Sequence, residues 1–416
     1  MKVGFVGLGK LGLPTALAIE SRGHDVMGYD VNPEVERYIR ERHIPYREMG
    51  ASELLKTTNI RFASVAELVR ECDFVYLAIQ TPHHPDYEGI TRLPISRVDF
   101  DYHYLIEAVQ QVIAEATAQD KHVQVVVVST ALPGTMEREI KPLLHQHGHL
   151  VYNPAFIAMG TTINDFLHPE FVLMGADPDN DEGAKLLSSF YATIHDRPTF
   201  VTDIKTAELI KVSYNTYIGA KIAFANTMME ICEKIGANVD DLTRGLSLAT
   251  TRLLSPKYLS AGMGDGGGCH PRDNIAMSWL AQNLELSHNL FEDLMLAREH
   301  QTDWLADVIE ETQRETSLPV ILLGRAYKPE TNLTVGSPAV LLSNILSERK
   351  TAHELWDPYV DEPREWPTAL YFISTNHQEF EEFAFPEGSV VVDPWRMIPE
   401  QTGIRVIGLG KPRNPA

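Results

Sequence analysis

The sequence predicts an α/β protein in which two parallel-sheet domains are joined by a long central helix and a helical middle domain. Three observations predict it: a strand-like segment runs into a glycine-rich turn at the N-terminus, a helical pattern continues through 203–236, and strands alternate with helices again from residue 316. At 416 residues the chain is too long for one ordinary core, so two or three domains are expected. We place them at 1–202, 203–315 and 316–416.

Composition narrows the class of protein. The chain is 44% hydrophobic and 22% charged, which is typical of a water-soluble globular protein. No apolar run approaches the ~18 to 20 residues that span a bilayer, and the chain begins with a strand instead of a signal peptide, so we expect a cytoplasmic protein with no membrane partner. A net charge of -21 argues against nucleic acid as a partner. The cysteines are few, odd in number and widely spaced, so neither a disulfide framework nor a metal site is expected from Cys72, Cys232 and Cys269.

The N-terminal segment carries the first functional pattern. An apolar strand, Met1–Val6, leads into the glycine turn at 7–12, a helical pattern covers Leu13–Arg22, and a second strand, His24–Tyr29, ends at Asp30. Glycines in such a turn let a pyrophosphate approach a helix N-terminus, and an acidic residue about 20 positions later binds the ribose hydroxyls. The glycines could instead make only a structural turn, but the flanking strand, helix and acid favour a dinucleotide-binding, Rossmann-like domain.

This pattern assigns the cofactor and its contacts. Asp30 favours NAD over NADP, because a carboxylate would repel a 2′-phosphate. The turn contributes six expected contacts, namely Gly7, Leu8, Gly9, Lys10, Leu11 and Gly12.

Later strands of this domain end on threonines. The strand Asp73–Gln80 is followed by Thr81, and Val123–Val128 is followed by Ser129 and Thr130. Ligands of open parallel sheets bind beyond the carboxyl ends of the strands, so we expect Thr81 and Thr130 to contact the cofactor. We expect a polar, proline-containing loop over His83–Val98, and the stretch Val151–Gly160 then leads into a variable segment and a last strand near Thr199–Thr202.

A helix of more than 30 residues is expected over Asp203–Gly236. Apolar residues recur there at helical spacing, at Leu209, Ile210, Ile218, Ile222, Met228, Met229 and Ile231. Lys211 and Asn215 are four residues apart and therefore share one face. The pair could be a solvated stripe, but on a helix enclosed by domains it is a candidate oxyanion clamp.

The stretch Gly264–Asp273 presents Cys269 after a run of glycines. Glycine lets the backbone approach a ligand closely, and cationic neighbours such as His270 and Arg272 favour the reactive thiolate. Asp273 could orient a water or a base. A cysteine alone is more often a buried core residue, and only its combination with the other motifs favours a nucleophile.

The remaining chain predicts more helices and a second sheet. Helices are expected over Leu242–Leu248 and Ile275–Val308, interrupted by the Cys269 loop, and a boundary is expected at Thr316–Pro319. A second parallel α/β layer then follows, with strands Val320–Gly324, His353–Trp356, Ala369–Ser374 and Ser389–Asp393 and a helix Pro338–Ser347.

As a set, these motifs resemble the UDP-glucose/GDP-mannose dehydrogenase family from Met1 to about Lys411. The segment 129–135, S-T-A-L-P-G-T, is similar to the family's S-T-V-x-P-G-T, and E-L-I-K at 208–211 with Asn215 is similar to E-L-x-K-x-x-x-N. The segment 266–273, G-G-G-C-H-P-R-D, is similar to G-G-S-C-F-P-K-D. Shorter matches are Tyr327-Lys328-Pro329 to F-K-P, Ser337-Pro338-Ala339 to S-P-A and Asp357-Pro358-Tyr359 to D-P-Y.

The resemblance implies oxidation of a nucleotide sugar's primary alcohol to a carboxylate, with two NAD reduced per turnover. Cys269 would attack the intermediate aldehyde to form a thiohemiacetal and then a thioester. Lys211 and Asn215 would stabilise the developing oxyanion, Asp273 would position or deprotonate the water, and Thr130 belongs to the same catalytic set.

The resemblance also implies the substrate contacts and the assembly. The nucleotide sugar, UDP-glucose or a related one, would be held by Lys211, Asn215, Arg252, Lys257, Tyr258, Leu259, Gly266 and Lys328. Arg252 would reach a neighbouring subunit in a homodimer built on the central helix.

Several positions depart from the family pattern. Where the family has N-P-E-F-L-x-E-G this chain has Ala155 and Met159, so both glutamates are missing, and the first is assigned a role in proton transfer and thioester hydrolysis. The family's D-D-x-R-E becomes N-L-T-V-G at 332–336, and aromatic residues beside the cysteine become Asp265 and His270. Two alternatives therefore stay open: oxidation that stops at the aldehyde or at a slowly hydrolysed thioester, and a catalytically silent protein that binds NAD and a nucleotide sugar.

Overall fold

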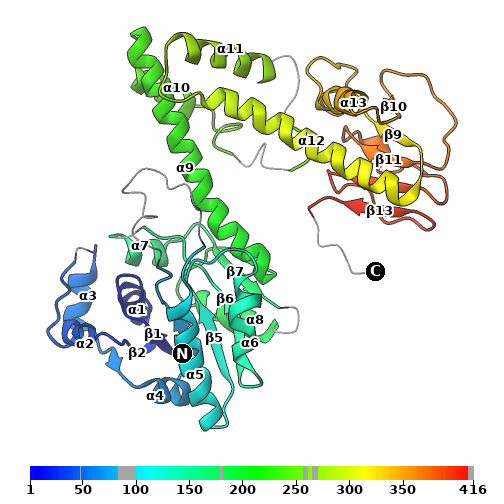
Figure 1. The fold of residues 1–416 in the computed structure, drawn as a ribbon. Coiled ribbons are helices and arrows are strands. Elements are labelled where there is room, and N and C mark those ends of the chain that lie inside the picture. Colours follow the sequence, from blue (N-terminus) through cyan, green and yellow to red (C-terminus); the bar gives the residue numbers. More distant parts are fainter. Residues whose placement is uncertain are drawn as a thin grey trace. The chain divides into compact units, whose positions relative to one another are not determined.

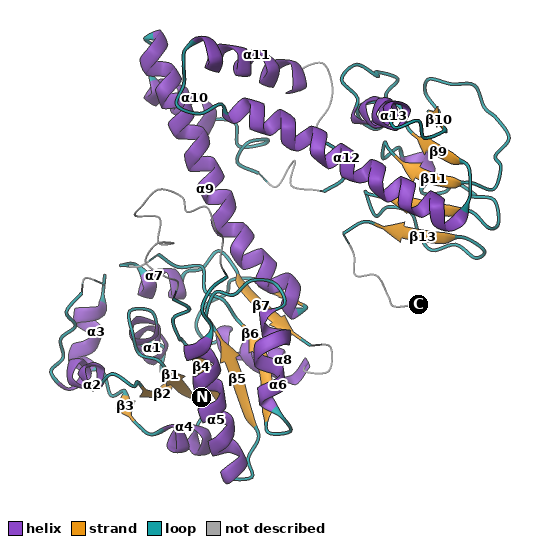
Figure 2. Ribbon diagram, in the orientation of Figure 1, coloured by secondary structure: helices purple, strands orange, loops and turns teal. Residues whose placement is uncertain are grey.

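The computed structural model describes residues 1–46, 48–82, 99–158, 160–177, 181–255, 261–264 and 270–410. The chain divides into two compact units, Met1–Gly219 and Ala220–Ala416, with the boundary inside one long helix. Figure 1 shows the order of the elements along the chain, and Figure 2 shows a sheet with surrounding helices in each unit.

The first unit is built on a sheet of eight strands, in the order β3-β2-β1-β4-β5-β6-β7-β8. These strands are β1 (Lys2–Val6), β2 (Asp25–Tyr29), β3 (Arg61–Phe62), β4 (Phe74–Leu77), β5 (Val123–Val127), β6 (Gly148–Tyr152), β7 (Val172–Ala176) and β8 (Thr199–Thr202). Neighbouring strands are parallel except β6 and β7, which pair antiparallel. The predicted Rossmann-like sheet is therefore confirmed, and the two strands that follow β6 extend it.

Helices cover both faces of this sheet. They are α1 (Gly12–Glu20), α2 (Pro33–Arg40), α3 (Ala51–Thr57), α4 (Val65–Glu71), α5 (His103–Ala118), a π-helical turn η2 (Met136–Ile140), α6 (Lys141–Leu144), α7 (Thr162–Leu167) and α8 (Asp181–Tyr191). Side chains of β4 alternate between two cores: Phe74 and Tyr76 pack in the cluster that contains α1 and α8 residues, while Val75 and Leu77 pack in the cluster that contains α4 and α5 residues. Residue-by-residue alternation is expected for a sheet buried on both sides.

Polar side chains cap the N-termini of two of these helices and so determine where they begin. Asn32 caps α2 through Glu34 N, and Pro33 occupies the first helical position. Ser64 and Glu67 form a reciprocal capping box at the start of α4.

The predicted central helix is confirmed as α9 (Ile204–Ile235), and Gly236 follows it with φ +74°. The left-handed conformation of Gly236 ends the helix at the position where glycine is favoured. In the first unit Ile204 and Ala207 are buried, and in the second unit Met228 and Ile231 pack with residues of later helices.

The helices of the second unit differ from the prediction in their bounds and in one break. They are α10 (Val239–Ser247), α11 (His270–Asn283) and α12 (Leu290–Thr316), so the helix expected over Ile275–Val308 is broken. Glu285 has φ +50°, which interrupts α11, and the Asn289 side chain accepts a hydrogen bond from Glu292 N and so caps α12. In the described part of the chain, no helix is long and apolar enough to cross a bilayer.

The second sheet has five parallel strands in the order β10-β9-β11-β12-β13. The strands are β9 (Val320–Leu323), β10 (His353–Trp356), β11 (Leu370–Ile373), β12 (Val390–Asp393) and β13 (Arg405–Gly408), accompanied by α13 (Pro338–Glu348) and a 3-10 turn, η4 (Gln378–Phe380). The predicted second Rossmann-like layer is confirmed, and β13 is a strand that the sequence did not reveal.

We expect Arg349 to be the main electrostatic link between α12 and α13. Its guanidinium lies 2.8 Å from Asp303, 2.6 Å from Asp307 and 3.3 Å from Glu310, and these carboxylates raise its pKa. Arg349→Ala leaves the three carboxylates facing one another, so we expect the second unit to lose about 1–2 kcal/mol of stability.

Tryptophan fluorescence during urea unfolding measures this loss, because every tryptophan of the chain lies in the second unit. Arg405→Ala is the matched control: Arg405 forms a single, exposed pair with Glu315 at 3.5 Å. Equal effects of the two substitutions would contradict the prediction.

Candidate active site

The glycine turn connects β1 to α1 and is shaped by close backbone packing. Gly7 has φ +91°, and its N–H donates to the Tyr29 carbonyl at 2.8 Å. A Cβ placed on Gly12 would lie 2.0 Å from the Gly7 carbonyl oxygen, whereas a Cβ on Gly9 would meet nothing within 4 Å. Gly7 and Gly12 are therefore required by the fold, while the open space at Gly9 lets a ligand approach the backbone, as a pyrophosphate must.

Asp30 joins the ends of the first two strands. One carboxylate oxygen accepts the Leu8 N–H at 2.7 Å, and the other accepts the Asn32 N–H at 2.8 Å. Asp30 is half-buried, so the carboxylate is held rigidly and still reaches the surface beside the glycine turn. Lys10 is exposed and Leu11 is half-buried in the same turn.

Thr81 and Thr130 are brought together at the ends of β4 and β5. The Thr81 hydroxyl donates to the Thr130 carbonyl at 3.0 Å, and the Ser129 hydroxyl donates to the Ile79 carbonyl. Strand β1 lies between β2 and β4, so the direction of strand order changes beside the glycine turn. The turn, Asp30 and the two threonines thus share the sheet edge where parallel α/β proteins bind ligands.

Glu208 on α9 fixes the loop that follows β5. Its carboxylate is fully buried and accepts the N–H groups of Gly134 at 2.5 Å and Met136 at 2.8 Å. Burial raises its pKa, although the two N–H bonds oppose that shift. Sequence reasoning did not assign this role; the only signal was that Glu208 and Gly134 belong to two motifs of one family pattern.

Lys211 lies one helical turn after Glu208 and is 7% exposed. Its ammonium donates to the Ala155 carbonyl at 2.7 Å and lies 5.0 Å from the centre of the Phe156 ring. Within the described part of the chain no carboxylate lies within salt-bridge distance of it, and burial lowers its pKa. Asn215, the predicted partner of Lys211, is exposed.

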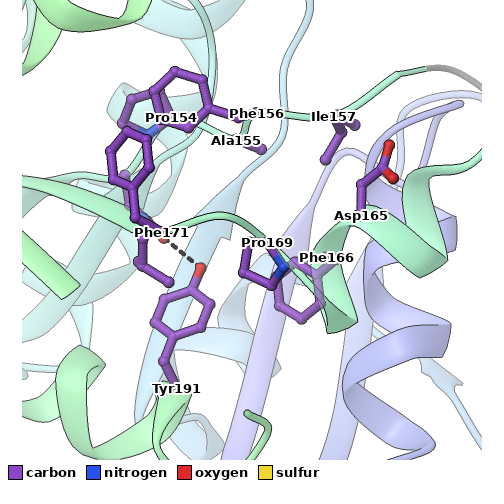
Figure 3. Close-up of a pocket in the computed structure, with 11 residues that line it drawn as sticks. Pro154, Ala155, Phe156, Ile157, Asp165, Phe166, Pro169, Phe171 and Tyr191 are labelled. Carbon is purple, nitrogen blue, oxygen red and sulfur yellow. Dashed lines mark hydrogen bonds between the residues drawn. The ribbon is translucent and has the colours of Figure 1, made fainter. Parts of the chain in front are cut away.

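Buried tyrosines hold the segment around Ala155 in place through hydrogen bonds. The Tyr76 hydroxyl donates to the Tyr191 hydroxyl at 3.0 Å. The Tyr191 hydroxyl donates in turn to the Asn153 side-chain carbonyl at 2.6 Å, the bond drawn as a dashed line at Tyr191 in Figure 3. The Asn153 amide donates in turn to the Leu173 carbonyl at 2.8 Å. This chain of hydrogen bonds fixes the backbone that presents the Ala155 carbonyl to Lys211.

A small pocket of about 30 Å³ lies beside Ala155 (Figure 3). Asp165 also lines it, and this carboxylate accepts the Ala158 N–H at 3.0 Å and the Thr161 hydroxyl at 2.8 Å. Nearby, the Tyr214 ring lies 4.6 Å from the Phe156 ring. Asp165 is thus already engaged with its own loop, and a methyl group occupies the position where the resemblance leads one to expect a glutamate.

The second unit holds a larger pocket, of about 540 Å³, at the carboxyl edge of its sheet. Nine residues line it, from the segments after β9, β11 and β12 and from the segment before the Cys269 loop: Ala261, Pro329, Glu330, Asn376, Gln378, Glu381, Trp395, Arg396 and Met397. The Arg396 guanidinium donates to the Ala261 carbonyl at 2.6 Å, and a Cβ on Gly262 would lie 2.3 Å from the Trp395 ring. The sequence did not predict this pocket, because its lining comes from four separate segments.

The structure leaves several predicted site residues untested. Five of them lie outside the described residues, namely Lys257, Tyr258, Leu259, Gly266 and Cys269, as do Asp265, Met159 and the expected loop His83–Val98. The backbone of Asp273 lies in the first turn of α11, and the side chain of this residue is outside the described set. Arg252 and Lys328 are exposed, and the Lys328 ammonium lies 5.4 Å from the centre of the Tyr327 ring.

Known proteins resemble this chain in sequence and in fold. Residues 1–195 match the NAD binding domain of the UDP-glucose/GDP-mannose dehydrogenase family, and residues 205–298 match its central domain. A putative UDP-glucose 6-dehydrogenase of Bacillus subtilis is 30% identical over 86% of this chain and 82% of its own length. A UDP-glucose 6-dehydrogenase of Rickettsia conorii is 28% identical over 86% of this chain and 81% of its own length.

Two solved structures share the fold. A ternary complex of GDP-mannose dehydrogenase from Pseudomonas aeruginosa superposes with a TM-score of 0.85 at 23% identity, covering 98% of this chain and 99% of that one. A UDP-glucose dehydrogenase from Pyrobaculum islandicum gives a TM-score of 0.54 at 24% identity, covering 97% and 96%. At these identities the likeness concerns the fold.

Proposed function

The chain belongs to the UDP-glucose/GDP-mannose dehydrogenase family of NAD-dependent nucleotide-sugar dehydrogenases, and we propose that it oxidises the C6 primary alcohol of a UDP-glucose-like nucleotide sugar to the uronic acid. The observation that carries the proposal is the buried Lys211 ammonium, whose described partners are a carbonyl and a ring instead of a carboxylate. A buried cation without a neutralising anion is costly in a stable fold, and such groups are enriched where negative charge develops during a reaction.

The residues of the first unit fit the cofactor. The open space at Gly9 suits the pyrophosphate, and Asp30 is fixed beside the turn to accept hydrogen bonds from the ribose hydroxyls. Thr81 and Thr130, which are joined by a hydrogen bond beyond the ends of β4 and β5, are the further proposed contacts of the cofactor. NAD, when bound there, supplies the acceptor for the hydride that is removed in each of the two oxidations.

The chemistry of two successive oxidations accounts for the residue types. A hydride leaves an alcohol carbon once a base has taken the hydroxyl proton, but the resulting aldehyde has no hydroxyl from which to expel a second hydride. The Cys269 thiolate adds to the aldehyde carbon and forms a thiohemiacetal, and loss of hydride from this carbon gives a thioester that water hydrolyses. Lys211 and Asn215 stabilise the oxygen on which charge develops, and Asp273 positions the water.

The second unit is proposed to hold the nucleotide. Its pocket lies next to the Tyr327-Lys328-Pro329 motif, and Lys328, Arg252, Lys257, Tyr258, Leu259 and Gly266 form the proposed substrate set. A homodimer through α9 completes the proposal. Large apolar side chains remain exposed on this helix, including Leu209 at 53%, Tyr217 at 51% and Met229 at 54%. Light scattering of the purified chain tests the dimer.

Counting NADH formed per sugar consumed tests the proposed function against its alternatives. Complete oxidation gives two NADH, oxidation that stops at the aldehyde or at a persistent thioester gives one or a burst, and a silent binding protein gives none. Mass spectrometry of the products with a panel of nucleotide sugars identifies the substrate in the same experiment.

We expect Ala155→Glu to accelerate release of the acid if thioester hydrolysis limits turnover. Residue 155 precedes Phe156, and its backbone carbonyl accepts the hydrogen bond from Lys211. A carboxylate on this residue can take a proton from water beside the lysine. The expected gain is about 10–100-fold in steady-state rate, measured as NADH formation after the burst.

Ala158→Glu is the matched control, because it adds the same charge at an exposed position of the same segment. An unchanged rate in Ala155→Glu would show that another group already performs this proton transfer.

A further inference from the structure

His377, in the second unit, is a wholly buried histidine with no role in the proposed chemistry. It lies between β11 and η4, and its ring is 0% exposed. The ring contacts Tyr359 at 4.9 Å and Phe380 at 5.6 Å between centres. A polar ring buried this deeply requires hydrogen-bond partners, and both of its nitrogens have one.

These partners define the tautomer of His377. The backbone N–H of Glu330 donates to Nδ1 at 3.2 Å, so Nδ1 carries a lone pair and no proton. Nε2 lies 3.1 Å from the Asp357 carboxylate, which can only accept, so Nε2 carries the proton. The histidine is thus neutral, and it bridges a backbone donor and a buried carboxylate.

Asp357 extends this bridge to the segment that follows β9. Its carboxylate is 0% exposed and accepts the N–H groups of Arg325 at 2.6 Å and Ala326 at 2.8 Å. Burial alone would raise the Asp357 pKa, but the bonds from His377 and from the two N–H groups outweigh burial and hold the pKa at about 2. Asp357 is therefore a fixed anion.

The His377–Asp357 pair holds both ends of the segment that carries Lys328. Asp357 binds the backbone just before Tyr327-Lys328-Pro329, and His377 binds the backbone of Glu330 just after it. The Thr375 hydroxyl adds a bond to the Ala326 carbonyl at 2.7 Å. Pro329 and Glu330 on one side, and the neighbours of His377 in sequence on the other, line the pocket of this unit.

We propose that His377, in its neutral Nε2–H form, is a positioning residue for substrate: it holds the Lys328 segment in the shape that receives the nucleotide sugar's phosphates. This inference rests on the proposed function, since it takes the pocket to be the nucleotide site. Its effect is confined to the second unit, so binding of NAD by the first unit is independent of it.

A metal ion is the competing explanation for the same residues. Glu330, His377 and Glu379 have potential ligand atoms within 4.8 Å of one another. However, both nitrogens of His377 are already engaged, and the Glu330 carboxylate accepts the Tyr359 hydroxyl at 2.8 Å and the Gln378 N–H at 3.2 Å. The single hydrogen of the Tyr359 hydroxyl is shared with Glu379, but His377 has no nitrogen left for an ion, so unchanged kinetics after EDTA treatment are expected.

Two substitutions separate the two bonds of His377. In His377→Asn the side-chain oxygen takes the place of Nδ1 and can still accept the Glu330 N–H, but Asp357 is out of reach. In His377→Gln the amide nitrogen takes the place of Nε2 and can still donate to Asp357, but the Glu330 N–H loses its acceptor. We expect His377→Gln to raise KM for the nucleotide sugar on the order of tenfold, with KM for NAD unchanged and kcat within about twofold, and we expect His377→Asn to raise it less.

His353→Asn is the matched control. His353 also hydrogen-bonds through both ring nitrogens, to Ser343 and Thr351. It is the first residue of β10 and so lies at the amino end of the strands, whereas the pocket lies at their carboxyl end. A purely structural role for His377 predicts a lower melting temperature in both His377 variants without a selective change in KM for the sugar, and that result would overturn the proposal. An unchanged KM in His377→Gln would overturn it as well.

A double-mutant cycle with Lys328→Ala tests whether His377 changes KM for the nucleotide sugar through the Lys328 segment. If His377 acts through Lys328, the combined variant raises KM by no more than the larger single effect. Additive effects would overturn the proposal. If Lys328→Ala alone leaves KM unchanged while the wild-type protein still makes two NADH per sugar, the positioning role fails and the proposed function survives. If His377→Gln does not fold, His377→Asn is combined with Lys328→Ala in the same double-mutant cycle.

Discussion

Replacing Cys269 by serine is expected to abolish formation of the acid. A serine hydroxyl is a far weaker nucleophile than a thiolate toward the aldehyde, because it remains protonated near neutral pH. In the proposed mechanism the first oxidation does not use the thiol, so the variant is expected to form at most one NADH per enzyme-bound sugar. Steady-state acid production should fall on the order of 10³-fold or more, measured by mass spectrometry of the uronic acid.

Cys72→Ser is the control for loss of a thiol. Cys72 is half-buried, and burial together with Glu71 and Asp73 raises its pKa to about 12, so it is protonated and inert at neutral pH. We expect this variant to retain activity and the wild-type protein to lose activity when Cys269 alone is alkylated. Unaltered acid formation by Cys269→Ser would remove it as the nucleophile.

Lys211→Met is expected to lower kcat by about 10²–10³-fold, the usual cost of removing one preorganised donor from a developing oxyanion. Methionine fills much of the same buried volume beside Phe156, so the fold should tolerate the change. Single-turnover measurement of NADH formation separates this chemical defect from a loss of substrate affinity.

The pH dependence gives a second readout for Lys211. Burial lowers the pKa of this lysine, so its charged form is lost at a lower pH than for an exposed lysine. If the ammonium is required, kcat falls on the alkaline side within that lowered range, and the Lys211→Met variant lacks this limb. Lys205→Met is the matched control, because Lys205 is an exposed lysine of the same helix, paired with Glu137 at 3.0 Å. A wild-type rate in Lys211→Met would mean that the oxyanion assignment is wrong.

The elements that the sequence predicted well are those with strong local signals. The glycine turn between β1 and α1 requires residues without a side chain, and apolar residues recur at helical spacing over many turns of the central helix α9. The break between α11 and α12 was missed because helical spacing continues across it, while one left-handed residue, Glu285, and one cap, Asn289, interrupt the hydrogen bonding. Strand β13 is short and half-exposed at a sheet edge, so its pattern is weak.

The site was predictable only as a set of separate motifs. Lys211 was identified from its spacing to Asn215, but its bond to the Ala155 carbonyl depends on how two distant segments pack. The same holds for Glu208, which binds the N–H groups of a loop more than 70 residues earlier. His377 had no sequence signal, because its role depends on backbone donors and a carboxylate that are remote in the chain.

The features at the carboxyl edge of each sheet come from one unit alone. The glycine turn and Asp30 belong to Met1–Gly219, and the residues that line the pocket of about 540 Å³ belong to Ala220–Ala416. On the proposed function, substitutions in the lining of that pocket change the preferred nucleotide without altering the glycine turn and Asp30, the proposed NAD contacts of the first unit. Chimaeras that exchange the C-terminal sheet between relatives are then expected to change the nucleotide preference and to keep the cofactor preference of the first unit.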